Sequence, residues 1–183
     1  MSSAAEINPA AAAALGFLNL NYVAVERERR WLCRPAPPEL VYETWAINDL
    51  YVEGTGLRLR EARSVNGGPP RLRFTRKADL DAQTRLITTI YLGETEFAML
   101  AAALEGRRLS KLRHRLRLAD GTRLSVDEFQ GDLAGLRLVE KEFESADALA
   151  AFQPPDFVHR EVTDDARYTG AQLAAHGLPR DRA

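Results

Sequence analysis

Regular alternation of charged and apolar residues is the feature that most constrains the fold of this chain. In Lys111–Leu118, lysine and arginine occupy every second position, and leucine or histidine fills the positions between them. Successive side chains of a β-strand point to opposite faces, so this run predicts a strand with one basic face. Arg71–Lys77 and Leu57–Arg60 show the same period of two. The chain is therefore predicted to consist mainly of antiparallel strands, each with one polar face.

The predicted elements are antiparallel strands with one helix midway and helices near the end of the chain. Strands are predicted at Asn21–Cys33, Ile47–Glu53, Gly56–Ala62, Arg71–Lys77, Gln83–Leu92, Leu109–Leu118, Arg123–Phe129 and Leu136–Glu144. Helices are predicted at Glu39–Ala46, Glu94–Glu105, Asp147–Phe152 and Asp164–Ala175. The Ala-rich residues 1–20 form either a short helix that Asn8 and Pro9 start or a disordered extension.

The sign of the charge is segregated between the predicted strands. The middle strands are almost entirely basic on their polar face, whereas separate acidic rows come from Glu26, Glu28, Asp127, Glu140 and Glu142. For any single strand, the simpler interpretation is one solvated face and one face on the core. A solvated face usually mixes both signs, however, because like charges in neighbouring positions repel.

Closure of the sheet into a barrel with its polar faces inward would explain this segregation. The lumen would then be a basic cavity with an acidic wall, and helices would cover the apolar outer faces. A concentrated cationic lumen requires an anion, and a carboxylate cluster inside it requires a metal ion. A metal-bound polyphosphate satisfies both requirements.

Bulk composition excludes several other classes of protein. A length of 183 residues predicts one domain, and a net charge of −1 favours neither a nucleic-acid nor a membrane partner. Cys33 is the single cysteine, which excludes an intramolecular disulfide framework and a cysteine-rich zinc site. No apolar run approaches the roughly 20 residues that cross a bilayer, and no lysine or arginine precedes the short run Ala10–Ala14. A cytoplasmic protein is predicted.

Six segments of the sequence, taken in order, carry a resemblance to a known family. They are Glu26–Arg30, Leu57–Arg60, Phe74–Lys77, Glu105–Arg113, Leu124–Phe129 and Leu138–Phe143. Together they resemble the CYTH family, also called the triphosphate tunnel metalloenzymes, whose sequences open on Glu-x-Glu-x-Lys and close on a Glu-x-Glu strand. The resemblance runs from about Val25 to Leu173 and looks closest to the compact bacterial inorganic triphosphatase branch, whose terminal helix is similar to Glu161–Tyr168.

The resemblance implies a fold and an activity. The fold would be α+β dominated by β: a closed eight-stranded antiparallel β-barrel with covering helices and a C-terminal helix that plugs the tunnel. Residues 21–183 would form this single domain, and residues 1–20 an N-terminal extension. The activity would be divalent-metal-dependent hydrolysis of inorganic triphosphate to pyrophosphate and phosphate, or of a small organic triphosphate.

The resemblance also implies roles for individual residues. The ligands of Mg²⁺ or Mn²⁺ would be Glu26, Glu28, Asp127, Glu140 and Glu142. The side chains that clamp the triphosphate would be Arg30, Arg58, Arg60, Lys77, Arg85, Arg113 and Arg115. Lys111 and Tyr51 would be catalytic, orienting the attacking water or protonating the leaving group.

Two positions depart from the family pattern. Arg30 stands where the family has lysine, and it keeps the positive charge without an ammonium that can release a proton. The family's central Arg-x-Glu-x-Glu strand is represented by Arg85–Thr89, in which Ile87 and Thr89 replace both carboxylates. The replacements would alter a second metal position, the rate or the choice of substrate.

Three other functions are weighed against the triphosphatase. An adenylate cyclase of the same family would use the same tunnel with a ribose hydroxyl as nucleophile. A non-catalytic polyphosphate or nucleotide sensor would be consistent with the missing central glutamates. A barrel that binds nucleic acid is disfavoured, because its cationic face would carry stacking aromatic residues. The expected partner is thus a small-molecule triphosphate, with no nucleic acid and no membrane, and a homodimer is left open.

Overall fold

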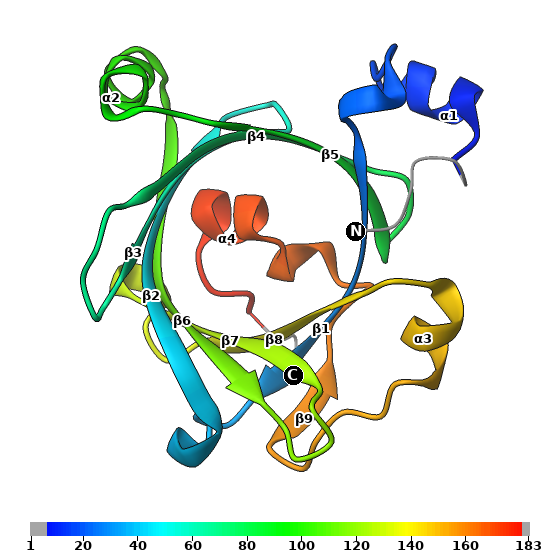
Figure 1. Cartoon of the computed structure of the whole chain (residues 1–183), viewed down its shortest axis with the longest axis vertical. Helices are drawn as coiled ribbons and strands as arrows, with labels where there is room; N and C mark the ends of the chain where they lie inside the picture. The colour runs from blue at the N-terminus through cyan, green and yellow to red at the C-terminus, as the bar shows by residue number, and fades with distance from the viewer. Residues whose placement is uncertain (1–6, 181–183) are drawn as a thin grey trace.

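Within residues 7–180, which the computed structural model describes, nine strands form one antiparallel sheet (Figure 1). They are β1 (Ala24–Cys33), β2 (Val41–Val52), β3 (Leu57–Ser64), β4 (Arg71–Asp79), β5 (Thr84–Tyr91), β6 (Gly106–Arg117), β7 (Arg123–Phe129), β8 (Arg137–Phe143) and β9 (Val158–Glu161). The order across the sheet is β5-β4-β3-β2-β6-β7-β8-β1-β9. A further pairing of β5 with β1 closes the first eight strands of this order into a barrel.

Strand β1 closes the barrel because it pairs with both β5 and β8. Ala24–Arg27 lies antiparallel to β5, and Arg27–Leu32 lies antiparallel to β8. Strand β9 pairs with Trp31–Cys33, past the end of β5, and lies outside the ring (Figure 1). The predicted closed eight-stranded antiparallel barrel is confirmed, and β9 is an additional strand.

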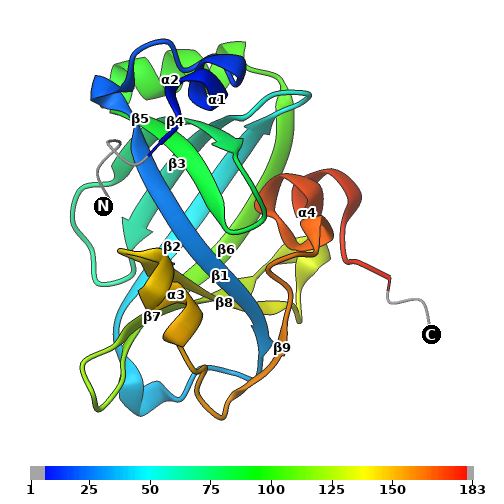
Figure 2. The same ribbon diagram turned by 90° about the vertical axis from the view of Figure 1, so that its right-hand side faces the viewer.

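Four α-helices accompany the barrel within the described residues (Figure 2). They are α1 (Pro9–Ala14), α2 (Glu94–Ala103), α3 (Ala146–Ala151) and α4 (Gly170–His176). Of the two alternatives for the Ala-rich segment, the helix is observed: the Asn8 side chain accepts a hydrogen bond from the Ala10 N–H at 2.9 Å, and Pro9 is the first helical residue. None of these helices has the length and apolar character that crossing a membrane requires.

Apolar side chains outside the barrel are covered by α3 and by the segment around α1. Leu149 of α3 packs in a buried cluster with Trp31 and Val139. Phe17, after α1, packs with Val25 and Leu86 in a second cluster. Residues 7–20 thus lie against the barrel, while the division into an extension and one domain stays a prediction.

Several predicted boundaries are wrong. Residues 39–46 do not form a helix: Pro38–Leu40 is a 3-10 turn, and Val41 starts β2, because the β-branched and aromatic residues that follow pair with β6. The terminal helix is shorter than predicted, since a 3-10 turn at Ala166–Tyr168 precedes α4. Helix α2 ends at Ala103, two residues before the predicted end, and its N-cap is Gly93, whose N–H donates to the Glu96 carboxylate at 2.7 Å.

Helix α4 plugs one end of the barrel. In Figure 1 it lies inside the ring of strands. Its buried Leu173 packs in a cluster with Leu109, Phe129 and Leu138, which come from three barrel strands. At the first residue of α4, a Cβ atom on Gly170 would lie 2.0 Å from the Tyr51 hydroxyl oxygen. This glycine therefore allows the plug to sit directly against Tyr51.

Replacing Gly170 with alanine should destabilise the protein by about 1–3 kcal/mol, because the added methyl group overpacks the contact with Tyr51. Urea unfolding measures this change. The matched control is Gly93→Ala, where the added Cβ would meet its nearest neighbour at an ordinary 3.5 Å. Equal stability of the Gly170→Ala variant and the wild type would contradict the described seating of α4.

Candidate active site

The barrel encloses a cavity of about 770 Å³, which falls within the usual size of ligand sites. All eight barrel strands contribute to its lining, and Tyr168–Ala171 closes one side. The cavity is lined by most of the predicted site residues, namely Glu26, Glu28, Arg30, Tyr51, Arg58, Arg60, Lys77, Arg85, Lys111, Arg113, Arg115, Glu140 and Glu142. The exception is Asp127, which is fully buried behind the cations of β6.

Two carboxylates on the β1–β8 wall have weaker cation partners than their neighbours. Glu28 lies 3.5 Å from Arg30 and 3.7 Å from Arg85, and among the described residues no cation lies within 4.0 Å of the Glu142 carboxylate. Glu28 and Glu142 lie directly opposite each other in the register of these strands. Burial, together with the charges of Glu140 and Glu26, raises the pKa of Glu28 to about 7. Burial and the charge of Glu26 also raise the pKa of Glu142. Like charges in directly opposed positions destabilise a sheet, so this pair favours a bound cation.

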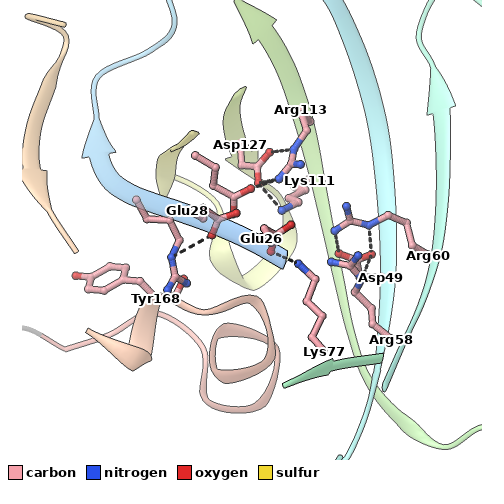
Figure 3. Close-up of polar contacts among 12 residues, drawn as sticks. Glu26, Glu28, Asp49, Arg58, Arg60, Lys77, Lys111, Arg113, Asp127 and Tyr168 are labelled. Carbon is pink, nitrogen blue, oxygen red and sulfur yellow. Dashed lines mark hydrogen bonds and ion pairs between the residues drawn. The ribbon is translucent and has the colours of Figure 1, made fainter. Parts of the chain in front are cut away.

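The two neighbouring carboxylates are paired with cations. Lys77 donates to Glu26 at 2.8 Å, and Arg113 donates to Glu140 (Figure 3 labels Lys77, Glu26 and Arg113). Burial raises the pKa of Glu140, but Arg113 and Lys111 outweigh burial and hold it well below its usual range. Burial likewise opposes Lys77 at Glu26, whose pKa is lowered overall. Both carboxylates are therefore ionised at neutral pH.

Asp127 is a counter-ion for two lumen cations (Figure 3). Its carboxylate accepts hydrogen bonds from Lys111 and from Arg113, whose Nε and Nη2 atoms lie 2.6 and 2.7 Å from the two oxygens. Its side chain has no exposed surface. With its oxygens occupied in this way, Asp127 fixes Lys111 and Arg113 and is poorly placed to hold a metal ion.

A second buried counter-ion, Asp49, was missed by the sequence analysis. Its carboxylate accepts two hydrogen bonds from Arg60, each 2.6 Å long, and lies 3.8 Å from Nε of Arg58 (Figure 3). Burial opposes these arginines, which nevertheless keep the pKa of Asp49 far below its usual range. Asp49 lies two positions from the lumen residues Ile47 and Tyr51 and shares their face of β2, so its inward position was visible in the sequence once β2 was recognised.

The two predicted catalytic residues occupy different hydrogen-bond networks. Lys111 binds Asp127, whereas the Tyr51 hydroxyl donates to Asp49 at 3.4 Å. Burial and the charge of Asp49 raise the pKa of Tyr51 to about 12. Tyr51 is thus a neutral hydrogen-bond donor at physiological pH, and Lys111 is an ammonium fixed by a carboxylate.

The remaining predicted cations differ in their freedom to meet a ligand. Arg30 is 3% exposed and donates to the Tyr168 carbonyl oxygen at 3.2 Å, which ties β1 to the plug. Arg85 lies 3.7 Å from Glu28 and 3.8 Å from Glu26. Arg115 pairs with Glu43 at 3.3 Å and its side chain is 41% exposed, so it lies at the rim of the lumen.

The β4–β5 wall carries no carboxylate where the family pattern has two. Ile87 and Thr89 line the cavity at these positions, and Thr89 lies opposite Thr75 in the register. Their hydroxyl oxygens are 3.2 Å apart, within hydrogen-bond distance. The acidic residues are consequently concentrated on the β1–β8 wall.

The residues of this wall fit a hard divalent cation. Among the described residues, no three acidic, histidine or cysteine side chains are arranged as a complete metal cage. Magnesium is usually bound through one or two carboxylates together with substrate phosphates, and does not need such a cage. Glu28 and Glu142, which are partners in the register, supply oxygen donors of this kind, and burial and neighbouring carboxylates raise the pKa of both.

Without added metal, the stability of the protein should fall as the pH rises from about 5 to 8. An acid whose pKa is raised on folding binds more protons in the folded state, so stability is lost as it ionises. The rise for Glu28, from 4.5 to about 7, corresponds to as much as about 3 kcal/mol. The ionisation of Glu140 changes the stability only at lower pH, because the pKa of Glu140 is lowered. Urea unfolding in EDTA at several pH values measures the slope, and a stability that rises through this window would contradict it.

Two curated relatives are similar to parts of the sequence. The inorganic triphosphatase of Nitrosomonas europaea is 47% identical over 85 residues, which are 46% of this chain and 56% of that protein. The inorganic triphosphatase of Acetivibrio thermocellus is 42% identical over 65 residues, which are 36% of this chain and 40% of that protein. The chain thus spans about half the length, or less, of the curated relatives it matches. No family model matches the sequence.

The fold and its charged lumen define a tunnel-type β-barrel whose interior is rich in arginine and lysine. The crystal structure of the inorganic triphosphatase NE1496 is similar to it with a TM-score of 0.56 and 33% identity, and the match covers 81% of this chain and 93% of that chain. The chain therefore belongs to the CYTH family of triphosphate tunnel proteins.

Proposed function

We propose that this protein hydrolyses inorganic triphosphate to pyrophosphate and phosphate inside the barrel, with a divalent metal ion bound at the acidic wall. The observation that supports this most is the opposed pair of Glu28 and Glu142, set in a lumen that is otherwise rich in arginine and lysine. The names of the relatives, both inorganic triphosphatases, favour the same substrate. A small organic triphosphate is the alternative substrate.

The cations of the lumen would bind and orient the phosphate chain. Guanidinium groups match phosphate oxygens with paired hydrogen bonds, and Arg60 and Arg113 are each held rigid by a buried aspartate. Hydrolysis of a phosphoanhydride depends mainly on such positioning and on neutralisation of charge. Asp49 and Asp127 are therefore positioning residues, which set the orientation of the arginines before the substrate arrives.

Mg²⁺ or Mn²⁺ would be held by Glu28 and Glu142, with Glu26 and Glu140 beside them. Such an ion neutralises phosphate oxygens and lowers the pKa of a bound water. Lys77 and Arg113 hydrogen-bond to Glu26 and Glu140, whereas Glu28 has only longer ion pairs with Arg30 and Arg85. Glu28 and Glu142 therefore keep carboxylate oxygens that a cation could bind.

Lys111 and Tyr51 would act on the reacting phosphate as donors. The ammonium of Lys111 would stabilise charge on the leaving oxygen, and the neutral hydroxyl of Tyr51 would orient a phosphate oxygen or the attacking water. The raised pKa of Tyr51 opposes a role as a base. Arg30 would contribute less directly, since it holds the plug segment through Tyr168.

Phosphate release from tripolyphosphate tests the proposal. With Mg²⁺ or Mn²⁺, the wild type should release phosphate well above its rate on ATP, and EDTA should abolish the release. Release that persists in EDTA would overturn the metal requirement. Tight, metal-dependent binding of tripolyphosphate without release would replace the enzyme with a sensor, the alternative that Ile87 and Thr89 favour.

A further inference from the structure

Two arginines on the wall formed by β3 and β4 lie directly opposite each other. Arg60 and Arg73 are partners in the register of these strands, and both line the cavity. Like charges in this arrangement repel and require compensation. The resemblance to the family drew attention to Arg60 and not to Arg73, although Arg73 follows the same alternation.

Compensation is present for only one of these two arginines. Asp49 binds Arg60 through two hydrogen bonds of 2.6 Å. Within the described part of the chain, no carboxylate lies within 4.0 Å of the Arg73 guanidinium, and its buried Nε has no hydrogen-bond partner. Burial, with the charges of Arg60 and Arg58, lowers the pKa of Arg73 to about 10. The side chain is still a cation at neutral pH, and it lacks an anion.

The neighbouring strand cannot provide that anion. Tyr91 lies opposite Arg73 on β5, and Thr89 lies opposite Thr75, so the wall around Arg73 presents hydroxyl groups and no carboxylate. Arg58, two residues from Arg60 on the same face of β3, is 3.8 Å from Asp49, and its own buried Nε also has no hydrogen-bond partner. Arg58 and Arg73 thus leave two guanidinium groups with unused donors on one wall.

This cationic wall lies across the barrel from Glu28 on β1 (Figure 1). Around the ring, β3 is three strands from β1, in the order β1-β5-β4-β3. Figure 1 shows β3 and β1 on opposite sides of the barrel. A linear phosphate chain that meets a metal ion at Glu28 and Glu142 with one end would therefore direct its other end toward Arg58 and Arg73.

We propose that Arg73, together with Arg58, binds the second terminal phosphate of the substrate, and that this contact makes Arg73 a specificity-determining residue. The inference rests on the proposed function. A terminal phosphate of tripolyphosphate carries no substituent and presents its full charge and three free oxygens to these donors. The corresponding phosphate of a nucleoside triphosphate is esterified, carries less charge and brings a bulky group against the wall. Arg73 thus favours unsubstituted inorganic chains over nucleoside triphosphates.

Substitution of Arg73 tests this selectivity. Arg73→Met should weaken the binding of tripolyphosphate about 10- to 100-fold, through the loss of charged hydrogen bonds, and change the binding of ATP less than about threefold. Calorimetry with Mg²⁺ gives both Kd values, and turnover gives both values of kcat/KM. Arg73→Lys should restore part of the selectivity, because it keeps the charge. The matched control is Arg63→Met, since the Arg63 side chain is 57% exposed and pairs with Glu61 outside the lumen.

The outcomes separate this inference from the proposed function. Wild-type selectivity for tripolyphosphate that falls in Arg73→Met and not in Arg63→Met supports the inference. Equal losses for tripolyphosphate and ATP, or no loss for either, overturn it even if the wild type is an active triphosphatase. Binding without turnover would overturn the proposed hydrolysis, and the two Kd values would still decide the role of Arg73. Failure of the wild type to bind tripolyphosphate would overturn both.

Discussion

Glu28→Gln is expected to lower metal-dependent hydrolysis of tripolyphosphate by about 10²- to 10³-fold, on the scale of losing one essential electrostatic contact in an active site. Glutamine keeps the shape of the side chain and removes the negative charge that would hold the cation. The loss should appear together with weaker binding of Mg²⁺ or Mn²⁺. Steady-state kinetics over a range of metal concentrations measures both effects.

The same substitution should stabilise the metal-free protein at pH 8. The pKa of Glu28 is raised because burial and neighbouring carboxylates disfavour its charge, so a neutral isostere removes an unfavourable interaction. We expect a gain of about 1–3 kcal/mol in urea unfolding with EDTA. Glu53→Gln is the matched control, because the Glu53 side chain is 69% exposed. A variant that is both inactive and destabilised would show that Glu28 supports the fold and not a cation.

Asp127→Asn should give the largest loss of stability, about 3–5 kcal/mol. The change leaves the buried cations Lys111 and Arg113 without the carboxylate that binds both of them. Urea unfolding measures the loss. Asp132→Asn, at an exposed position before β8, provides the matched control. A loss no larger than that of the control would contradict the role of Asp127 as a buried counter-ion.

The alternation in the sequence was sufficient to predict which residues line the lumen on β4 and β6. The period of two needs no tertiary information, so Lys77, Lys111 and Arg113 were correctly expected on an inward face. Strand β2 was harder to predict, because charged and apolar residues do not alternate regularly in its first half. Residues 39–46 were therefore mistaken for a helix. Strand β9 was missed, since it is four residues long and mostly exposed.

The pairing of charges could not be predicted, because it depends on the register between strands. Asp49 meets Arg60 only because β2 and β3 align these positions, and Glu28 faces Glu142 only through the register of β1 and β8. The alternation in Arg71–Lys77 places Arg73 on the lumen face of β4. Its lack of a counter-ion, however, can be recognised only when all neighbouring strands are in place. The cytoplasmic location and a homodimer stay predictions of the sequence.

A crystal structure with Mn²⁺ and a nitrogen-bridged, non-hydrolysable analogue of tripolyphosphate tests the metal site and the orientation of the substrate most directly. Anomalous scattering locates the manganese independently of the phosphates. The expected arrangement is a manganese ion between Glu28 and Glu142, with the analogue inside the barrel and its far phosphate against Arg58 and Arg73. Manganese bound elsewhere, or an analogue bound outside the barrel, would contradict it.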